Sequence, residues 1–499
     1  MKQLNWKIGL VVLCVVGVCG VCVAADAAAS SVDQKRVERF ASPTEEPHPH
    51  AETWWDELWG TFHNPTPYLE MGLDHRFRSV WAENIVTLDD DNVNHEWEYQ
   101  RYRTRWWTKW VLGEDVDFNT RLTWEFRTWD EPRNKDQEMD CDEALFDHFN
   151  ITMRNLGGMP LTATIGRQDL IFGGAWLILD GTPLDGSRTI YFDAARFTYD
   201  WTETNTKVDL VYVSQSAESD RWLKPLSDEN RGVTEQDEHG AIVYLTNKSI
   251  ENTQLEGYFI YRNDNPIDRN DDPNDKLENF SRSWSRKAEI FTLGAAVAGT
   301  PSENWKYRVE AAMQQGDKWD APTALGQNNG PKKDLKAYGL VSNLEYLLKD
   351  PQDHSFHVGY EYASGDEDPN DGDNNQFDLL WGEWPRWSEL YIYTVIPEGT
   401  VAEISNLHRV NFGHKFRPHS QWQICTDYHY LWADENTGAG FSDSSGKSRG
   451  QLLTCWAKYT FSKQLKGHLL AEYFIPGSFY ASSHSDEAYF LRFNLEYTF

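Results

Sequence analysis

The last residues of the chain, YFLRFNLEYTF at positions 489–499, decide its fold. Apolar side chains stand at every second position from Leu491 to Phe499, and polar ones such as Arg492 and Glu496 stand between them. Successive side chains of a β-strand point to opposite faces, so this alternation predicts a strand with one apolar and one polar face. In a soluble sheet the aromatic face would need a second layer to cover it.

The same alternation runs through most of the chain. In the segment 117–129, Leu122 and Trp124 share one face, while Arg121 and Glu125 share the other. No helix of four turns is expected between such segments. Eighteen strands are predicted: 67–79, 97–111, 117–129, 144–155, 160–168, 189–200, 205–215, 239–248, 253–263, 287–299, 303–315, 335–348, 354–364, 403–416, 420–432, 448–461, 464–475 and 487–499.

The connections between these segments are of two kinds. Some are tight, such as 112–115 and 418–419, and others are long and acidic, such as 217–238 and 364–401. Short turns at one end and long loops at the other are typical of a transmembrane barrel, in which lipid covers the apolar face. The predicted fold class is all-β, an antiparallel up-and-down β-barrel of about 18 strands with short periplasmic turns and long acidic extracellular loops. The soluble alternative is a secreted β-sandwich or propeller with a sugar-binding face.

The beginning of the chain carries an export signal. The apolar run 8–23 follows Lys2 and Lys7 and leads into the small residue Ala25, which predicts a signal peptide over 1–25. A transmembrane anchor is the alternative, but the run is shorter than the ~20 residues that a spanning helix needs.

Two further segments complete the predicted organisation. Residues 26–65 are expected to form a flexible leader with a short Trp-rich segment, or else a plug or a periplasmic interaction segment. The barrel is expected over 66–499, in the bacterial outer membrane and in contact with its lipid. A terminal strand that ends in Phe499 resembles the signal by which outer-membrane proteins engage the barrel-assembly machinery.

Composition excludes several classes. The 47 basic and 78 acidic residues give a formal net charge of −31, which excludes a nucleic-acid partner because a phosphate backbone selects basic surfaces. Cys141, Cys425 and Cys455 remain after the signal, too few for a disulfide framework. Alternation places Cys425 and Cys455 on opposite faces, so no bond between them is expected. No CxxC or HExxH spacing occurs, and no metal site or cofactor is predicted from such motifs.

The polar face of the barrel would line the lumen, and it is rich in arginine. On the segment 97–111, Arg101, Arg103, Arg105 and Lys109 fall on one face. A guanidinium group pairs bidentately with a carboxylate, so this face indicates a conduit for an anionic solute. The candidate lumen residues are Arg76, Arg78, Arg101, Arg103, Arg105, Lys109, Arg121, Arg127, Arg154, Arg167 and Arg196. The same parity adds Arg262, Arg308, Arg409 and Arg492.

A structural role competes with this function. Inward carboxylates could pair with the arginines in ladders that only stiffen the wall; they are Glu70, Asp74, Glu125, Glu256, Glu310, Glu345, Glu361, Asp427, Glu472 and Glu496. Outward aromatics such as Trp106, Trp110 and Trp124 are expected to form the interfacial belt, with sugar stacking as the alternative.

Much of the acidic charge lies in the expected loops, at 89–91, 268–275 and 365–375. These loops are candidates for binding divalent cations, and a solvated acidic surface is the alternative. The long loop 365–401, which holds Trp381, Trp384 and Trp387, is a candidate lid or plug, and an ordered external loop is the plainer alternative.

Four functions remain open at this point: a passive channel for anionic saccharides, a general porin for other small solutes, a structural or adhesive barrel whose loops plug the lumen, and an enzyme barrel such as a protease or lipase. His148, His357 and His429 face inward, but no serine is marked as a nucleophile beside them. The protein is therefore not expected to be an enzyme.

Two stretches carry a family resemblance. Residues 164–199, TIGRQDLIFGGAWLILDGTPLDGSRTIYFDAARFTY, pair a strand ending in Gly-Arg-Gln with a strand that carries Phe-Asp-Ala-Ala-Arg. Residues 360–380, YEYASGDEDPNDGDNNQFDLL, run from a strand into Ser-Gly-Asp. Both resemble the alginate-export family of outer-membrane barrels.

The resemblance implies a monomeric channel of eighteen strands that passes a polyuronate along an arginine-lined lumen. Arg167 and Arg196 match the arginines of the family motif. Alternation places Arg196 in the lumen but Arg167 on the lipid side, unless a bulge at Gly166 turns it inward. The acidic loops depart from what a polyanion channel would prefer, so uptake or export of another sugar stays open.

Overall fold

The computed structural model describes residues 54–135, 137, 143–179, 191–217, 222–226, 236–266, 286–320, 329–382, 386–395, 404–438 and 440–499. The predicted signal peptide and most of the leader lie outside these residues. The Trp-rich segment forms helix α2 (Trp54–His63), which directly precedes the first strand.

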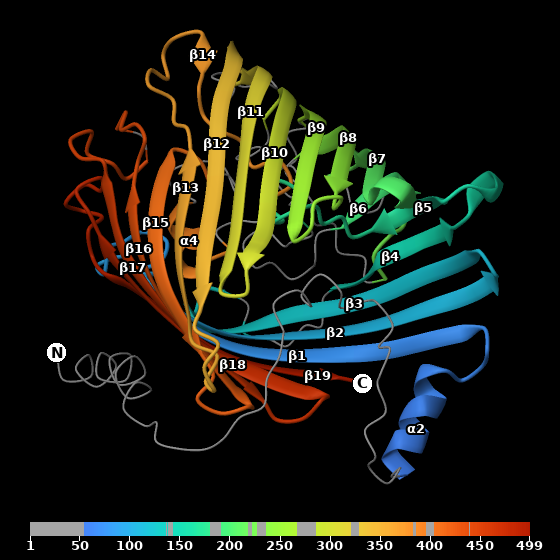
Figure 1. Cartoon of the computed structure of the whole chain (residues 1–499). Coiled ribbons are helices and arrows are strands. Elements are labelled where there is room, and N and C mark those ends of the chain that lie inside the picture. Colours follow the sequence, from blue (N-terminus) through green and yellow to red (C-terminus); the bar gives the residue numbers. More distant parts are fainter. Residues whose placement is uncertain are drawn as a thin grey trace.

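The chain folds into one closed antiparallel barrel (Figure 1). Its eighteen wall strands are β1 (Leu69–Glu83), β2 (Glu96–Gly113), β3 (Val116–Glu131), β4 (Glu143–Met153), β5 (Leu161–Gln168), β6 (Phe192–Trp201), β7 (Thr206–Gln215), β8 (Asp237–Asn247), β9 (Thr253–Asn265), β10 (Ala288–Ser302), β11 (Trp305–Trp319), β12 (Lys332–Leu347), β13 (Ser355–Ala363), β15 (Leu407–Phe416), β16 (Trp422–Trp432), β17 (Ser448–Thr460), β18 (Leu465–Pro476) and β19 (Ala488–Thr498).

Pairing of β1 with β19 closes the barrel, so the first and last strands of the chain lie side by side. The two-residue strand β14 (Asp373–Asn374) is not part of the wall, since it belongs to the loop between β13 and β15. The prediction of eighteen alternating strands is confirmed. Short helices complete the described elements: η1 (Leu156–Gly158), η3 (Thr202–Thr204) and α4 (Leu390–Val395).

Alternation along each strand separates a lipid face from a lumen face. On β7, Leu210 and Tyr212 are 48% and 56% exposed, whereas the alternate residues Asp209 and Val211 are 0% and 4% exposed. The outward side chains are apolar because lipid must contact them, and a charge at the bilayer midplane would cost about 2–4 kcal/mol. No described helix has the length and hydrophobicity needed to span a bilayer.

The two described cysteines agree with their predicted faces. Thr426 of β16 pairs with Cys455 of β17, so these two side chains share one face of the sheet. Cys425 precedes Thr426 on the strand and therefore points to the opposite face. Neither of these two cysteines forms a disulfide bond.

Helix α2 packs on the C-terminal residue. The ring of Trp59 lies 3.8 Å from that of Phe499 and the ring of Phe62 lies 4.5 Å from it. His63 Nδ1 also lies 2.7 Å from the carbonyl oxygen of Met71 on β1. The end of the predicted leader is therefore docked against the seam between the first and last strands (Figure 1).

Candidate functional site

Four neighbouring strands align their inward residues in three rows across the wall. Read in the order β19, β1, β2 and β3, the rows are Thr498–Asp74–Arg105–Thr123, Glu496–Arg76–Arg103–Glu125 and Asn494–Arg78–Arg101–Arg127. These twelve positions hold six arginines and three carboxylates. We call Arg76, Arg78, Arg101, Arg103, Arg105 and Arg127 the arginine wall.

Two carboxylates are shared among four of these arginines. The Nε atom of Arg105 donates to both oxygens of Asp74 at 3.0 Å, and Arg103 Nη2 lies 3.6 Å from the same carboxylate. Arg76 Nη2 donates to Glu125 Oε1 at 3.1 Å, and Arg101 pairs with that oxygen as well. Each carboxylate thus balances only part of the positive charge beside it.

The third row contains no carboxylate. Arg78 Nε donates to the neutral Asn494 at 2.9 Å, and the guanidinium group of Arg127 lies 4.4 Å from the ring centroid of Tyr99. Arg101 stands between them and is only 1% exposed. Like charges directly opposite one another in a sheet repel. The three arginines of this row are direct neighbours, and Arg101 also pairs with Glu125 of the second row.

Three other predicted lumen residues lie apart from the arginine wall. Lys109 is 3.3 Å from Glu70, and both side chains are about one-third exposed. Arg196 faces inward and donates from Nε to Asp209 at 2.8 Å. Arg154 follows β4 at the periplasmic turn, where it pairs with Asp117 and is 40% exposed.

Arg121 faces inward but is neutralised. Its Nε donates to Asp147 at 2.7 Å, and its two terminal nitrogens donate to the carboxylate of Asp169 at 3.1 Å. His148 lies 2.8 Å from Asp169. Burial alone would raise the pKa of Asp169, but Arg121 and His148 outweigh burial and lower it below the ordinary value. The role of this cluster is structural, and the sequence did not identify its two aspartates.

The prediction that Arg167 lines the lumen is wrong. Its Nε donates to Asp193 of β6 at 3.0 Å, and its Nη1 donates to the Phe146 carbonyl of β4 at 2.9 Å. Gly166 has φ +119°, yet the β4–β5 register continues without a shift. The side chain is 2% exposed and lies between strands of the wall. It stays there because a carboxylate and a carbonyl satisfy its donors.

The inward arginines of β9, β11, β15 and β19 form ion pairs with nearby carboxylates. Arg308 Nη2 lies 2.6 Å from both Glu256 and Glu310. The others have comparable partners: Arg262 with Glu238 and Asp264, Arg409 with Glu361, and Arg492 with Glu389. The contacts of these arginines are those of the structural alternative, a ladder of arginine–carboxylate pairs that stiffens the wall.

The segment after β5 packs against the inner wall. Phe172 stacks on Tyr244 of β8 at 4.8 Å, and a Cβ at Gly173 would meet the Tyr244 hydroxyl at 2.4 Å. Gly173 has φ +57°, a conformation that favours glycine. The loop segment 169–179 therefore leaves the wall at β5 and presses closely on β8.

The loop between β13 and β15 enters the same space. Trp381 donates from Nε1 to Glu238 of β8 at 2.6 Å, and Trp387 donates to Glu361 of β13 at 3.0 Å. A parallel bridge joins Trp381 to Ile178, so the two inward segments support one another. The described part of the candidate lid is thus a folded insert. Trp384 lies outside the described residues.

Ionic contacts fasten this second insert to the wall. Glu472 of β18 accepts hydrogen bonds from the backbone N–H groups of Glu389 and Leu390, at 3.0 and 2.6 Å. Asp378 lies 2.8 Å from Lys318 of β11. Burial alone would raise the pKa of Asp378, but Lys318 and Arg262 hold it below the ordinary value. The insert therefore remains charged and anchored near neutral pH.

An apolar patch on the lumen face supports the inserts, and the prediction of a polar lining missed it. Val211, Ile242, Ile260, Ile290 and Leu335 are inward residues of strands β7 to β12, with exposures from 0 to 4%. They pack in one cluster with Leu177, Ile178, Phe377 and Leu379 of the inserts. The available signal was the break in alternation, since runs such as 210–213 are apolar on both faces.

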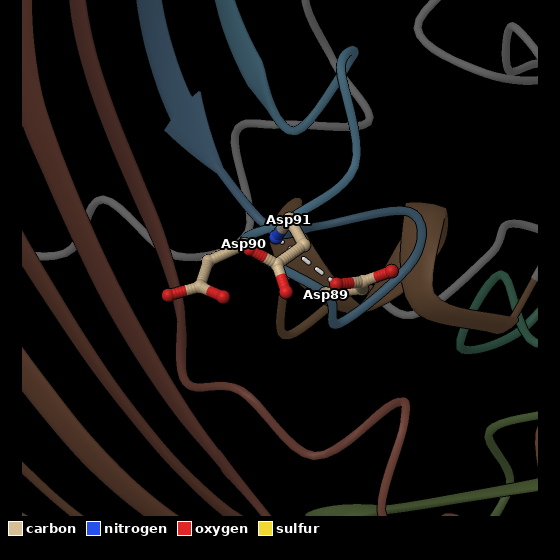
Figure 2. A group of neighbouring side chains, drawn as sticks. All are labelled: Asp89, Asp90 and Asp91. Atoms are coloured by element: carbon tan, nitrogen blue, oxygen red, sulfur yellow. Dashed lines mark hydrogen bonds between the residues drawn. The ribbon is translucent and has the colours of Figure 1, made fainter.

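One group of described acidic residues has the spacing of a cation site. Asp89, Asp90 and Asp91 lie in one turn of the β1–β2 loop, where Asp91 N donates to Asp89 Oδ1 at 3.0 Å (Figure 2). Their carboxylates are half-buried or exposed. The predicted binding of divalent cations at this loop stays a prediction, and loop 268–275 lies outside the described residues.

The inward histidines are engaged in polar contacts. His357 Nε2 lies 2.6 Å from Asp427, whose other oxygen accepts from Cys425 Sγ at 3.4 Å. His429 Nδ1 lies 3.2 Å from the guanidinium group of Arg409.

Comparison with known proteins identifies the family. The model of the alginate export family matches residues 67–491. The chain belongs to the alginate export family. Among curated proteins no significant match was found.

Solved structures with the same fold are outer-membrane proteins of Pseudomonas aeruginosa. OpdK with vanillate and OccK1 (OpdK) each have a TM-score of 0.50 at 9% identity, and each comparison covers 86% of this chain and 98% of the other. The outer membrane protein opdK gives 0.49 at 9% identity, with coverage of 86% and 99%. At this identity the likeness concerns the fold alone. Family and fold together make this protein an outer-membrane channel, a class that transports solutes rather than catalysing reactions.

Proposed function

We propose that this alginate export family member passes an anionic, alginate-like saccharide along the arginine wall. The observation that carries the proposal is the row Arg78–Arg101–Arg127, in which three arginines are neighbours in the strand register with Asn494 as the fourth member. A carboxylate that reaches this row would relieve the repulsion and form charge-assisted hydrogen bonds, each contributing about 1.5–3 kcal/mol.

The position of the inserts supports the same path. Their hydrogen bonds and ion pairs reach β3, β8, β9, β11, β13, β18 and β19 among the described residues. The arginine wall of β1 to β3 takes part in none of these anchoring contacts. A solute that enters the lumen would thus meet the arginine wall on one side and the inserts on the other.

Single-channel conductance in a planar bilayer tests the proposal. We expect a channel that prefers anions and is blocked by oligouronates but not by neutral oligosaccharides of equal length. Arg103→Glu should weaken both properties. A channel that prefers cations and ignores oligouronates would reduce the function to that of a general porin.

A barrel closed by its own loops is the second candidate, because two inserts occupy part of the lumen. The same recording decides between them. Complete absence of conductance, in protein whose folding is verified by heat-modifiable migration, would favour a structural barrel.

A further inference from the structure

The hydrogen-bonded wall of the barrel is interrupted between β4 and β5. The two strands pair only from Met153–Ala163 to Phe149–Arg167, although β4 begins six residues earlier, at Glu143. The chain beyond β5 turns inward, since Asp169 already contacts Arg121. The outer part of β4 is therefore without a β5 partner along this edge.

Unpaired backbone groups at a barrel edge are costly next to lipid, so something must cover this edge. Arg167 is placed to do so. It donates to the Phe146 carbonyl, which lies beyond the last β4–β5 pair, and it forms two hydrogen bonds to Asp193 at 3.0 and 3.3 Å. One side chain thus connects β4 to β6 across the interruption.

Aromatic rings enclose this connection. The Arg167 guanidinium carbon lies 3.7 Å from the ring centroid of Tyr191 and 5.1 Å from that of Trp222. Trp222 Nε1 donates to Asp193 at 3.0 Å, and Leu226 N donates to the Ala144 carbonyl of β4 at 2.6 Å. The segment 222–226 therefore covers the same edge from a different loop.

We propose that Arg167 and Asp193 form a clamp that seals the wall where β5 ends and the chain turns into the lumen. The two arginines of the motif then have separate positions, because Arg196 lies in the lumen beside Asp209 and Arg167 lies in the wall. The proposal does not depend on which solute the channel carries.

The clamp predicts a leak that is separate from solute recognition. In Arg167→Met, which keeps the length of the side chain but removes its donors, we expect about twofold greater open-channel noise and baseline conductance. The concentration of oligouronate that blocks half the current should change less than twofold, if the wild-type channel is blocked at all. Arg417→Ala, which breaks an exposed pair with Asp353 at a periplasmic turn, is the matched control and should behave as wild type.

A second variant tests the same proposal if the Arg167→Met protein does not assemble. Asp193→Asn keeps the shape of the side chain and removes its charge, and it should produce the same leak with a smaller amplitude. The exchange Arg167→Asp with Asp193→Arg should restore only part of the seal, because the bond to the Phe146 carbonyl is lost. Wild-type noise and conductance in the assembled Arg167→Met or Asp193→Asn protein would overturn the proposal.

Discussion

The two sides of this barrel use inward arginines in opposite ways. Around Arg262 and Arg308 on strands β9 and β11, each guanidinium group has at least two carboxylates, and folded inserts cover the wall. On β1 to β3, six arginines share three carboxylates within their rows. Each arginine thus has two or more carboxylates on one wall, whereas on the other wall the arginines outnumber the carboxylates of their own rows. Alternation places an arginine in the lumen, but its partners decide whether it is available to a solute.

Removal of the second insert should alter the difference between the two walls the most. If residues 376–395 are replaced by a short Gly/Ser linker, the covered wall loses its insert, and single-channel conductance should rise several-fold because the lumen widens. Deletion of 440–445, in the β16–β17 loop, is the control and should leave conductance nearly unchanged. Equal conductance in both proteins would mean that the insert does not narrow the path.

Neutralising one arginine of the arginine wall and one arginine of β11 should separate the binding of the solute from the stability of the barrel. In Arg78→Gln, oligouronate block should weaken about tenfold or more, since one charge-assisted hydrogen bond contributes roughly 1.5–3 kcal/mol. In Arg308→Gln, block should be nearly unchanged while the temperature of heat-modified migration falls. The reverse pattern would place the solute path along β9 to β11.

Loss of a neutralised arginine should cost stability. Arg121→Ala leaves Asp147 and Asp169 without the cation that both contact, and uncompensated buried charges typically cost about 3–5 kcal/mol. Denaturant unfolding in detergent micelles should report a loss of this size. Arg133→Ala removes an arginine that is 84% exposed and should change stability by less than about 1 kcal/mol. Equal midpoints for the two variants would contradict the structural role of Arg121.

The smallest expected effect is a pH response of the outer loops. Asp486 accepts a hydrogen bond from Asp90 N, and its carboxylate raises the pKa of Asp90 above the ordinary value. The folded loop therefore binds a proton more readily than the unfolded chain. The contact between Asp90 and Asp486 should be more stable when the pH falls below the raised pKa of Asp90 and less stable above it. Amide hydrogen exchange in the β1–β2 loop, corrected for intrinsic rates, should become slower as the pH falls. Asp486→Asn should remove this pH dependence of the exchange rate.

Strand number and strand faces were predictable because alternation is a local property. Each wall strand must present apolar side chains to lipid, so every wall strand has apolar residues at alternate positions of its own sequence. The same rule correctly placed Arg103 and Arg196 in the lumen. For Arg167 the rule indicated the outward face, and only the family motif suggested the lumen. The side chain lies along the wall because Asp193 and the Phe146 carbonyl accept its hydrogen bonds.

The sequence by itself determined the barrel, its membrane location and the inward arginines, because one period-two pattern specifies all three. Only the tertiary structure decided which arginines are balanced, since Asp169, Glu389 and Asp378 reach their partners from loops far away in the chain. It also decided that 169–179, 376–382 and 386–395 fold inward, because the apolar patch that includes Val211 and Ile242 forms only when β7 to β12 lie side by side. Register, loop insertion and charge balance are properties of the closed barrel.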